Sequence, residues 1–202
     1  MFIVFEGIDG VGKSTQIELL VDRLLAAGYR VMSTREPGGT EIGEKLRDLL
    51  KSDHSMGDRS ELLLMLASRS QHVDSVIRPA LEGDTLVICD RFEASTFAYQ
   101  GYGRGMDLDQ LRAINEFATG GLEADVTFLI DREGSFRVNL DEDRFESAGA
   151  DFAARVRKGY KELARQVNWF TIDGDQKIGE VHREICDRLF DLGLAKIRDY
   201  GS

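Results

Sequence analysis

Cysteine is scarce in this sequence, which contains only Cys89 and Cys186. The two residues lie far apart in the chain and have none of the spacings typical of cysteine metal sites. Both fall within apolar, periodic stretches, where a free cysteine behaves as a small buried side chain. We therefore expect two buried free thiols.

The sequence also lacks long hydrophobic runs and an excess of basic over acidic residues. The apolar run that begins at Phe2 has only the length of a strand, too short for a signal peptide or a membrane span. Lysine and arginine number 26 against 36 aspartates and glutamates, a formal net charge of −10. Polyanion binding relies on basic surface, so we expect no nucleic acid polymer as partner. Without a membrane segment, the cytoplasm is the expected compartment.

A glycine-rich turn joins the first apolar run to an amphipathic helical pattern. Gly7, Gly12, Lys13 and Ser14 have the spacing of the phosphate-binding loop, G-x-x-x-x-G-K-[ST]. Glycines let the backbone curl so that N–H groups point at phosphate oxygens, and the helix N-terminus adds partial positive charge. Lys13 can reach the outer phosphates and the Ser14 hydroxyl can hold Mg²⁺. The loop predicts a nucleoside triphosphate site.

Strand and helix patterns alternate along the rest of the chain. Further strands are expected at residues 29–33, 85–89, 126–130 and 169–172, and helices at 14–27, 93–100, 108–118, 151–167 and 177–192, with a glycine-rich loop at 101–105 and a break near Pro79. Five strands alternating with helices predict an α/β fold with a parallel sheet, here a three-layer αβα P-loop NTPase fold. No repeat or linker divides residues 1–202, so we expect one domain. The polar segment at about 132–150 is expected to form a short mobile lid.

Arginines outside the phosphate loop narrow the class of protein. Arg35, Arg47, Arg69 and Arg91 lie in four segments that follow strands or belong to the helices between them. A small-molecule kinase needs such a second anionic site, because the guanidinium fork matches phosphate geometry. A GTPase switch would need an Asn-Lys-x-Asp segment, which this chain lacks. The pattern favours a kinase.

Four segments together resemble thymidylate kinases of the bacterial type. They are Glu6-Gly-Ile-Asp-Gly-Val-Gly-Lys-Ser-Thr15, Thr34-Arg-Glu-Pro-Gly-Gly-Thr40, Asp90-Arg-Phe92 and Ser95-Thr-Phe-Ala-Tyr-Gln-Gly101. They occur in the family's order over nearly the whole chain, and the second is close to diagnostic. The resemblance implies transfer of the γ-phosphoryl group of ATP to dTMP, giving dTDP and ADP, with Mg²⁺, by a homodimer.

The resemblance also implies roles for individual residues. ATP is expected on Gly7, Gly10, Val11, Gly12, Lys13, Ser14 and Thr15. Mg²⁺ is expected at Ser14, Asp9 and Asp90. The dTMP site is expected to comprise Asp9, Glu36, Pro37, Arg47, Met65, Arg69, Arg91, Ser95, Thr96, Tyr99 and Gln100. Arg47 and Arg91 would hold the phosphate and Arg69 the thymine. Tyr99 would pack on the deoxyribose, and the peptide before Pro37 would be cis.

Two positions depart from the family pattern. Met65 stands where a phenylalanine usually stacks on thymine, so the aromatic stacking contribution is lost. The lid is shorter and more acidic than usual, which leaves Arg137 and Arg144 as the expected catalytic arginines beside Asp9, Lys13 and Arg91. Since Gly10 replaces the arginine that one subgroup carries in its phosphate loop, this arginine must come from the lid.

Two alternatives remain open from the sequence. The first is another nucleoside monophosphate or deoxynucleoside kinase, which a panel of acceptors would distinguish. The second is a nucleotide-binding protein that has lost catalysis, in line with the reduced lid.

Overall fold

The computed structural model describes residues 1–52, 55–133, 149–166 and 168–197. Its strands are β1 (Phe2–Glu6), β2 (Val31–Arg35), β3 (Leu86–Asp90), β4 (Val126–Asp131) and β5 (Trp169–Asp173). Its α-helices are α1 (Lys13–Ala26), α2 (Glu41–Lys51), α3 (Asp58–His72), α4 (Arg78–Glu82), α5 (Glu93–Thr96), α6 (Leu108–Thr119), α7 (Ala150–Leu163) and α8 (Ile178–Asp191). The π-helices are η1 (Val73–Ile77) and η2 (Phe97–Gly103), and η4 (Ala195–Ile197) is a 3₁₀-helix.

The five strands form one parallel sheet in the order β2-β3-β1-β4-β5. All five residues of β1 are buried, as expected for a central strand covered on both faces. The predicted α/β fold with a five-stranded parallel sheet is confirmed. Among the described residues, no helix has both the length and the hydrophobicity needed to cross a bilayer.

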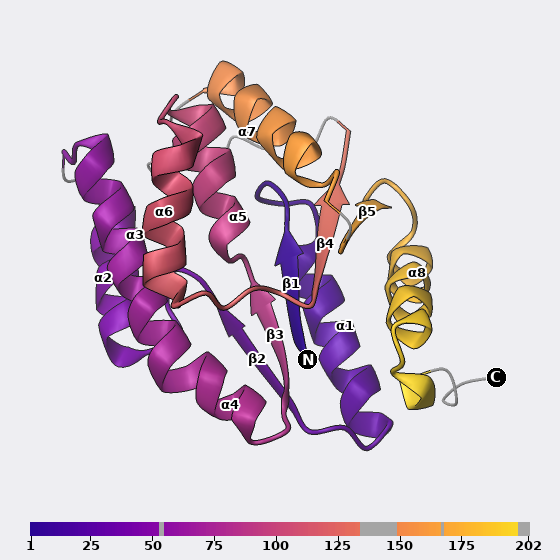
Figure 1. Cartoon of the computed structure of the whole chain (residues 1–202). Coiled ribbons are helices and arrows are strands. Elements are labelled where there is room, and N and C mark those ends of the chain that lie inside the picture. The colour runs from indigo at the N-terminus through magenta and orange to yellow at the C-terminus, as the bar shows by residue number, and fades with distance from the viewer. Residues whose placement is uncertain (53–54, 134–148, 167, 198–202) are drawn as a thin grey trace.

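Alternate residues of the central strands pack into opposite layers, and Figure 1 shows helices on both sides of the sheet. Ile3 and Phe5 face a cluster that takes in Leu20 and Leu24 of α1 and Ile185 of α8. Phe2, Val4, Val87 and Cys89 face the other layer, where Val73 and Ile77 of η1 cover them. Period-two alternation in a strand thus places one helical layer on each side of the sheet.

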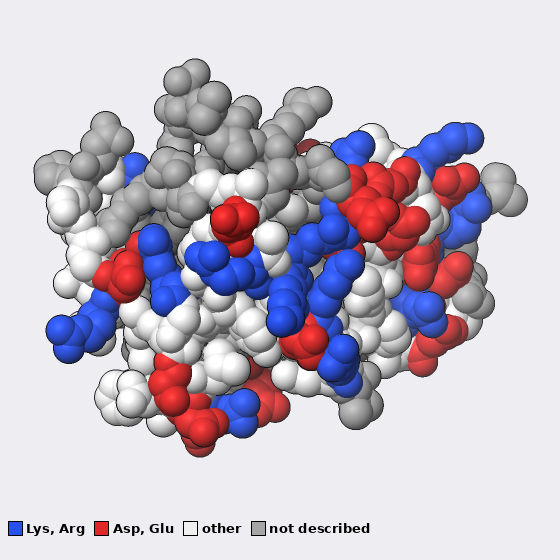
Figure 2. Space-filling view, turned by 90° about the horizontal axis from the view of Figure 1, so that it is seen from above, with Lys and Arg blue, Asp and Glu red and all other residues white. Residues whose placement is uncertain are grey.

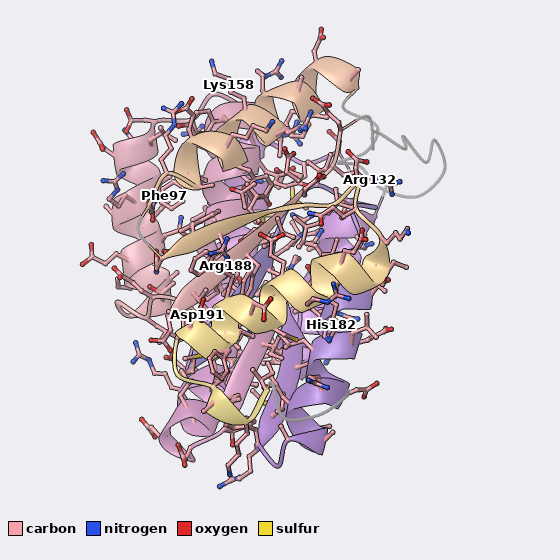
Figure 3. All side chains as sticks on the ribbon, turned by 90° about the vertical axis from the view of Figure 1, so that its right-hand side faces the viewer. Phe97, Arg132, Lys158, His182, Arg188 and Asp191 are labelled. Carbon is pink, nitrogen blue, oxygen red and sulfur yellow. The ribbon has the colours of Figure 1, made fainter. Side chains whose placement is uncertain are left out.

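Helix α8 packs in part against the outer strand β5. Arg188 of α8 lies over the ring of Phe170 with 5.2 Å between its guanidinium carbon and the ring centroid, and Figure 3 shows α8 crossing this side of the sheet. This contact fixes the helix over β5 by a cation–π interaction.

Two sequence predictions need correction. The expected loop at 101–105 is helical as far as Gly103, because η2 continues α5 without a break. Here Gly101 and Gly103 serve close packing: an added Cβ would lie 2.5 Å from Leu108 and 2.6 Å from Phe152. The strand expected at 29–33 begins and ends two residues later, so Arg35 is its last residue and pairs with Asp90. Most of the predicted lid, residues 134–148, lies outside the described residues.

Candidate active site

The phosphate loop connects β1 to α1 at the carboxyl edge of the sheet. Gly7, Gly10 and Gly12 have φ angles of 140°, 76° and 101°, which favour glycine. A Cβ on Gly7 would lie 2.5 Å from the carbonyl oxygen of Ile130 in the adjacent β4, so no other residue fits there without movement. The curled backbone leads directly into the first turn of α1, the geometry that binds phosphate.

Lys13 opens α1 and is buried beneath the loop. Its Nζ donates to the carbonyl oxygens of Gly7 and Ile8, each at 3.0 Å. Burial lowers the pKa of Lys13 to about 8, and the charge of Arg91 acts in the same direction. Phosphate oxygens would favour its charged form, since an opposite charge stabilises an ammonium group.

A pocket of about 300 Å³ opens beside the loop. Ser14 and Asp9 of the loop line it together with Arg69 and with Arg91, which pairs with Asp9. Figure 2 shows lysine and arginine side chains gathered near the middle of the face seen from above, toward which the strands point in Figure 1. The predicted residues that line the pocket are Asp9, Ser14, Glu36, Pro37, Arg47, Met65, Arg69, Asp90, Arg91, Ser95, Thr96 and Tyr99.

Arg69 is buried at one end of the pocket. Its Nε donates to Glu36 Oε2 at 2.7 Å, and its Nη1 donates to Thr96 Oγ1 at 2.8 Å and to Asn115 Oδ1. Its Nη2 donates to the carbonyl oxygen of Phe92 at 2.9 Å. These bonds fix the guanidinium plane, because each one uses a donor in a fixed direction.

Glu36 also contacts His72, which the sequence did not single out. Its Oε1 lies 3.1 Å from His72 Nδ1, and His72 Nε2 lies 2.6 Å from Thr34 Oγ1. The Glu36–Pro37 peptide is cis, as the family resemblance implied. Asn115 and His72 occupy buried helix positions that resemble ordinary core residues in the sequence, so no pattern marked them.

Arg91 follows β3 and stands at the other end of the pocket. Its Nη2 donates to Asp9 Oδ1 at 2.9 Å, and its guanidinium carbon lies 5.2 Å from the centroid of the Tyr99 ring. The charge of Arg91 is the main cause that holds the pKa of Asp9 far below its ordinary value. Arg47 enters from α2, where its Nη1 donates to the carbonyl oxygen of Pro37 at 2.8 Å. Arg47 and Arg91 therefore bring positive charge into the pocket that the phosphate loop lines.

The donors for a divalent ion are partly in place. Asp90 Oδ1 is buried without a hydrogen-bond partner among the described residues, and Asp90 lines the pocket with Ser14. Asp9, by contrast, already pairs with Arg91. Among the residues described, no cluster of three or more histidines, cysteines, aspartates or glutamates forms an enclosed cage. An ion held by one or two protein groups, substrate phosphates and water fits this arrangement.

Several predicted residues lie elsewhere. Gln100 is fully buried and does not line the pocket; its Nε2 donates to Glu61 Oε1 at 2.9 Å. Val11 is a core residue and Thr15 is exposed in the first turn of α1. Arg137 and Arg144 lie outside the described residues. Leu50 and Lys51, at the end of α2, line the pocket without having been predicted.

Known proteins share both the sequence and the fold. The sequence model of the family described as thymidylate kinase matches residues 5–185. A thymidylate kinase from Desulfovibrio desulfuricans is 50% identical over 180 residues, 82% of this chain and 83% of the relative. One from Halothermothrix orenii is 44% identical over 198 residues, 94% and 96% of the two chains. The crystal structure of thymidylate kinase from Ehrlichia chaffeensis matches with a TM-score of 0.80 and 36% identity, over 94% of this chain and 98% of that one. The chain belongs to the thymidylate kinase family.

Proposed function

We propose that this protein transfers the γ-phosphoryl group of ATP to dTMP, giving dTDP and ADP. The observation that carries the proposal is that one and the same pocket is lined by Ser14 and Asp9 of the phosphate loop and by Arg47, Arg69 and Arg91. A phosphoryl transfer enzyme needs donor and acceptor phosphates in one pocket, aligned and neutralised.

ATP binds on the phosphate loop in this proposal. Backbone N–H groups of the loop and Lys13 hold its phosphates, since both lie at the N-terminus of α1. Ser14 and Asp90 hold Mg²⁺, which supplies charge neutralisation for the transferring group. Within the part of the chain that the structure describes, Oδ1 of Asp90 has no hydrogen-bond partner, which supports its assignment as an acceptor toward the ion or its water.

The acceptor dTMP lies across the pocket from ATP. Arg91 and Arg47 bind its phosphate, and Arg69 with Thr96 faces the thymine. Tyr99 covers the sugar, and Met65 contacts the base through its polarisable thioether. Because Arg69 is fixed by four hydrogen bonds, it presents a rigid edge to the base.

The protein's side chains then act by positioning the two substrates and by neutralising the charge of their phosphates. The acceptor phosphate is already anionic, so no general base is required. Lys13, Arg91 and an arginine of the lid, Arg137 or Arg144, offset the charge of the transferring group. Asp9 holds Arg91 in place on the loop side of the pocket.

The family also supports a homodimer in the cytoplasm. Phe117 of α6 is 88% exposed and Leu63 of α3 is 64% exposed, and these two helices pack beside each other. Large exposed apolar side chains on neighbouring helices support an interface between two copies.

A panel of acceptors tests the proposed activity. Purified protein with ATP and Mg²⁺ is assayed by coupled ADP detection on dTMP, dUMP, dGMP, dCMP, UMP and thymidine. We expect the highest kcat/KM with dTMP. The best turnover on any acceptor other than dTMP or dUMP would overturn the proposal, and ATP and dTMP binding without dTDP formation would favour a non-catalytic protein.

A further inference from the structure

We propose that Tyr160, together with Glu6, is a positioning group that fixes the guanidinium of Arg91 for the acceptor phosphate. This inference rests on the proposed function, since it concerns how the phosphate-binding arginine is held. Tyr160 lies on α7, far from Arg91 in the sequence, and is almost fully buried.

The backbone of Arg91 is held in an uncommon conformation. Its φ angle is 72°, in the left-handed region that residues with a Cβ seldom adopt. Its N–H donates to the carbonyl oxygen of Phe5 at 2.9 Å, and Cys89 Sγ donates to its carbonyl oxygen at 3.0 Å. The direction in which the side chain leaves β3 is therefore set by the backbone.

The guanidinium is only partly occupied by protein groups. Nη1 donates to Tyr160 Oη at 2.8 Å and to Ser95 Oγ at 3.2 Å, and Nη2 donates once to Asp9. A guanidinium has five N–H donors. In the part of the chain that the structure describes, these three bonds do not use Nε–H or the second hydrogen of Nη2, on neighbouring nitrogens, although the guanidinium also lies within hydrogen-bonding range of Tyr99. Such a pair matches two oxygens of one phosphate group.

Glu6 decides which way the two hydroxyls point. Its Oε2 accepts from Tyr160 Oη at 2.9 Å and from Ser95 Oγ at 2.7 Å. Its Oε1 accepts from the backbone N–H groups of Phe92 at 2.9 Å and Ser95 at 3.2 Å. Ser95 Oγ and Tyr160 Oη also lie 2.8 Å apart, and either can donate to the other. Each hydroxyl has one hydrogen, so a hydroxyl that donates to Glu6 turns its lone pairs to Arg91 Nη1. Burial raises the pKa of Glu6, while the charge of Arg91 and the hydrogen bonds from Ser95 Oγ, the Phe92 N–H and Tyr160 Oη oppose that effect.

Loss of the Tyr160 hydroxyl would therefore release the guanidinium. One Nη1 hydrogen and one Glu6 lone pair would be left buried without a partner, a costly state. Ser95 Oγ would still accept from Nη1, but only at 3.2 Å, and the other partners of Arg91 are Asp9 of the phosphate loop and the Tyr99 ring. The guanidinium would rotate toward them, away from the direction that presents Nε and Nη2 to dTMP.

The test compares Tyr160→Phe with Tyr29→Phe. Tyr29 is partly buried in the core, and its Oη accepts from Lys196 N at 3.3 Å, remote from the pocket. For Tyr160→Phe we expect kcat/KM for dTMP to fall at least about 10-fold, as for an unsatisfied buried donor. KM for ATP should stay within about twofold, and Tyr29→Phe should leave both unchanged.

Binding of dTMP and of thymidine separates positioning from general damage. Thymidine lacks the phosphate, so calorimetry should show weaker dTMP binding to Tyr160→Phe but unchanged thymidine binding. An equal loss for both ligands, or a parallel rise in KM for ATP, would show a merely structural role and overturn the inference. If Tyr160→Phe does not fold, Ser95→Ala removes the other acceptor of Nη1, and the same selective loss of dTMP binding is expected.

Arg91→Ala distinguishes this inference from the function on which it rests. It should lower kcat/KM for dTMP at least about 30-fold, the scale of a removed charge-stabilising donor. If Arg91→Ala has little effect, the proposed phosphate site is wrong and the inference falls with it. If Arg91→Ala has the large effect and Tyr160→Phe changes kcat/KM less than twofold, the inference alone is overturned.

Discussion

At the scale of single residues, the buried carboxylate of Glu36 organises the acceptor end of the pocket. It accepts from Arg69 Nε at 2.7 Å and contacts His72 Nδ1 at 3.1 Å. His72 in turn reaches Thr34 Oγ1 of β2 at 2.6 Å. A chain of buried polar groups is rigid only when each member has its partner. Gly39 is the residue that leaves room for this chain.

We expect Gly39→Ala to destabilise the fold by about 2–4 kcal/mol, from backbone strain and overpacking together. At φ 76° an added Cβ would lie 2.4 Å from His72 Nε2 and 2.7 Å from Thr34 Oγ1. Gly28→Ala is the matched control, because its φ is 81° and no atom of the described residues lies within 4 Å of the added Cβ. Urea unfolding of both variants measures the difference. Equal losses would show that strain alone accounts for the effect.

The sequence predicted the positions of those site residues that belong to a local motif. The phosphate loop and the segment around Glu36 carry fixed spacings, so their places in the pocket could be anticipated. His72, Asn115 and Tyr160 could not, because each sits singly at a position that periodicity assigns to the core. Glu6 opens the phosphate-loop segment, but no spacing in the sequence indicated its partners. Their partners lie on other elements, and only the packed structure brings them together.

At the scale of elements, the pairing of β4 with α7 connects the sheet to the helix that follows residues 134–148. Arg157 donates to Asp131 through Nε at 2.6 Å and Nη2 at 3.0 Å, and Lys161 Nζ lies 3.0 Å from Asp131 Oδ2. Burial raises the pKa of Asp131, but the hydrogen bonds and charges of Arg157 and Lys161 outweigh it and hold the pKa below its ordinary value. The carboxylate therefore stabilises the fold in its charged form.

We expect Asp131→Asn to lower the free energy of unfolding by about 1 kcal/mol at pH 7, the upper part of the range for partly exposed pairs. A depressed folded-state pKa stabilises the protein above the unfolded pKa, and this contribution is lost as pH falls through the folded value. The difference from wild type should thus be constant from pH 7 to 5 and shrink below about pH 4. Urea unfolding at pH 7 and 3.5 measures it.

Asp175→Asn is the control for this pair, because Asp175 meets Arg132 in an exposed ion pair at 3.0 Å (Arg132 is labelled in Figure 3). Its loss should be smaller at both pH values, since exposed pairs contribute little. A difference for Asp131→Asn that does not change with pH would contradict the assigned role of its charge.

The identity of the elements could be predicted more reliably than their ends. Apolar runs identified all five strands, and helical periodicity identified helices between them. Strand β2 nevertheless extends to Arg35, because it pairs with β3 there. The predicted loop at 101–105 failed for a related reason. Glycine marks loops in a sequence, yet Gly101 and Gly103 are needed where η2 packs closely on Leu108 and Phe152.

At the scale of the whole molecule, the chain is acidic, yet it gathers arginines around the pocket at the carboxyl ends of the strands. The formal net charge is −10, but arginines from β2, α2, α3 and the end of β3 line one pocket. The alternation of strands and helices predicted this convergence, because ligand sites of parallel sheets lie at the carboxyl ends of their strands. It could not predict which helical faces remain exposed, since that depends on how α3 and α6 pack.

The exposed face of α3 and α6 supports the last prediction, on the proposed homodimer. Phe117 is 88% exposed, which is unusual for a phenylalanine side chain, and Leu63 is 64% exposed. A second copy would bury both side chains. An aspartate at position 117 would be solvated in the monomer but would lose its water in an interface.

We therefore expect the wild type to sediment as a dimer and Phe117→Asp to raise the dimer dissociation constant at least about 30-fold, for a penalty of about 2 kcal/mol or more. Leu192→Asp is the control, because Leu192 is 44% exposed just beyond α8, away from α3 and α6. It should leave the dimer intact. Sedimentation velocity over a range of concentrations measures all three proteins, with circular dichroism to establish that each is folded. A wild type that remains monomeric, or a Phe117→Asp variant that dimerises as tightly as wild type, would place the interface elsewhere or remove it.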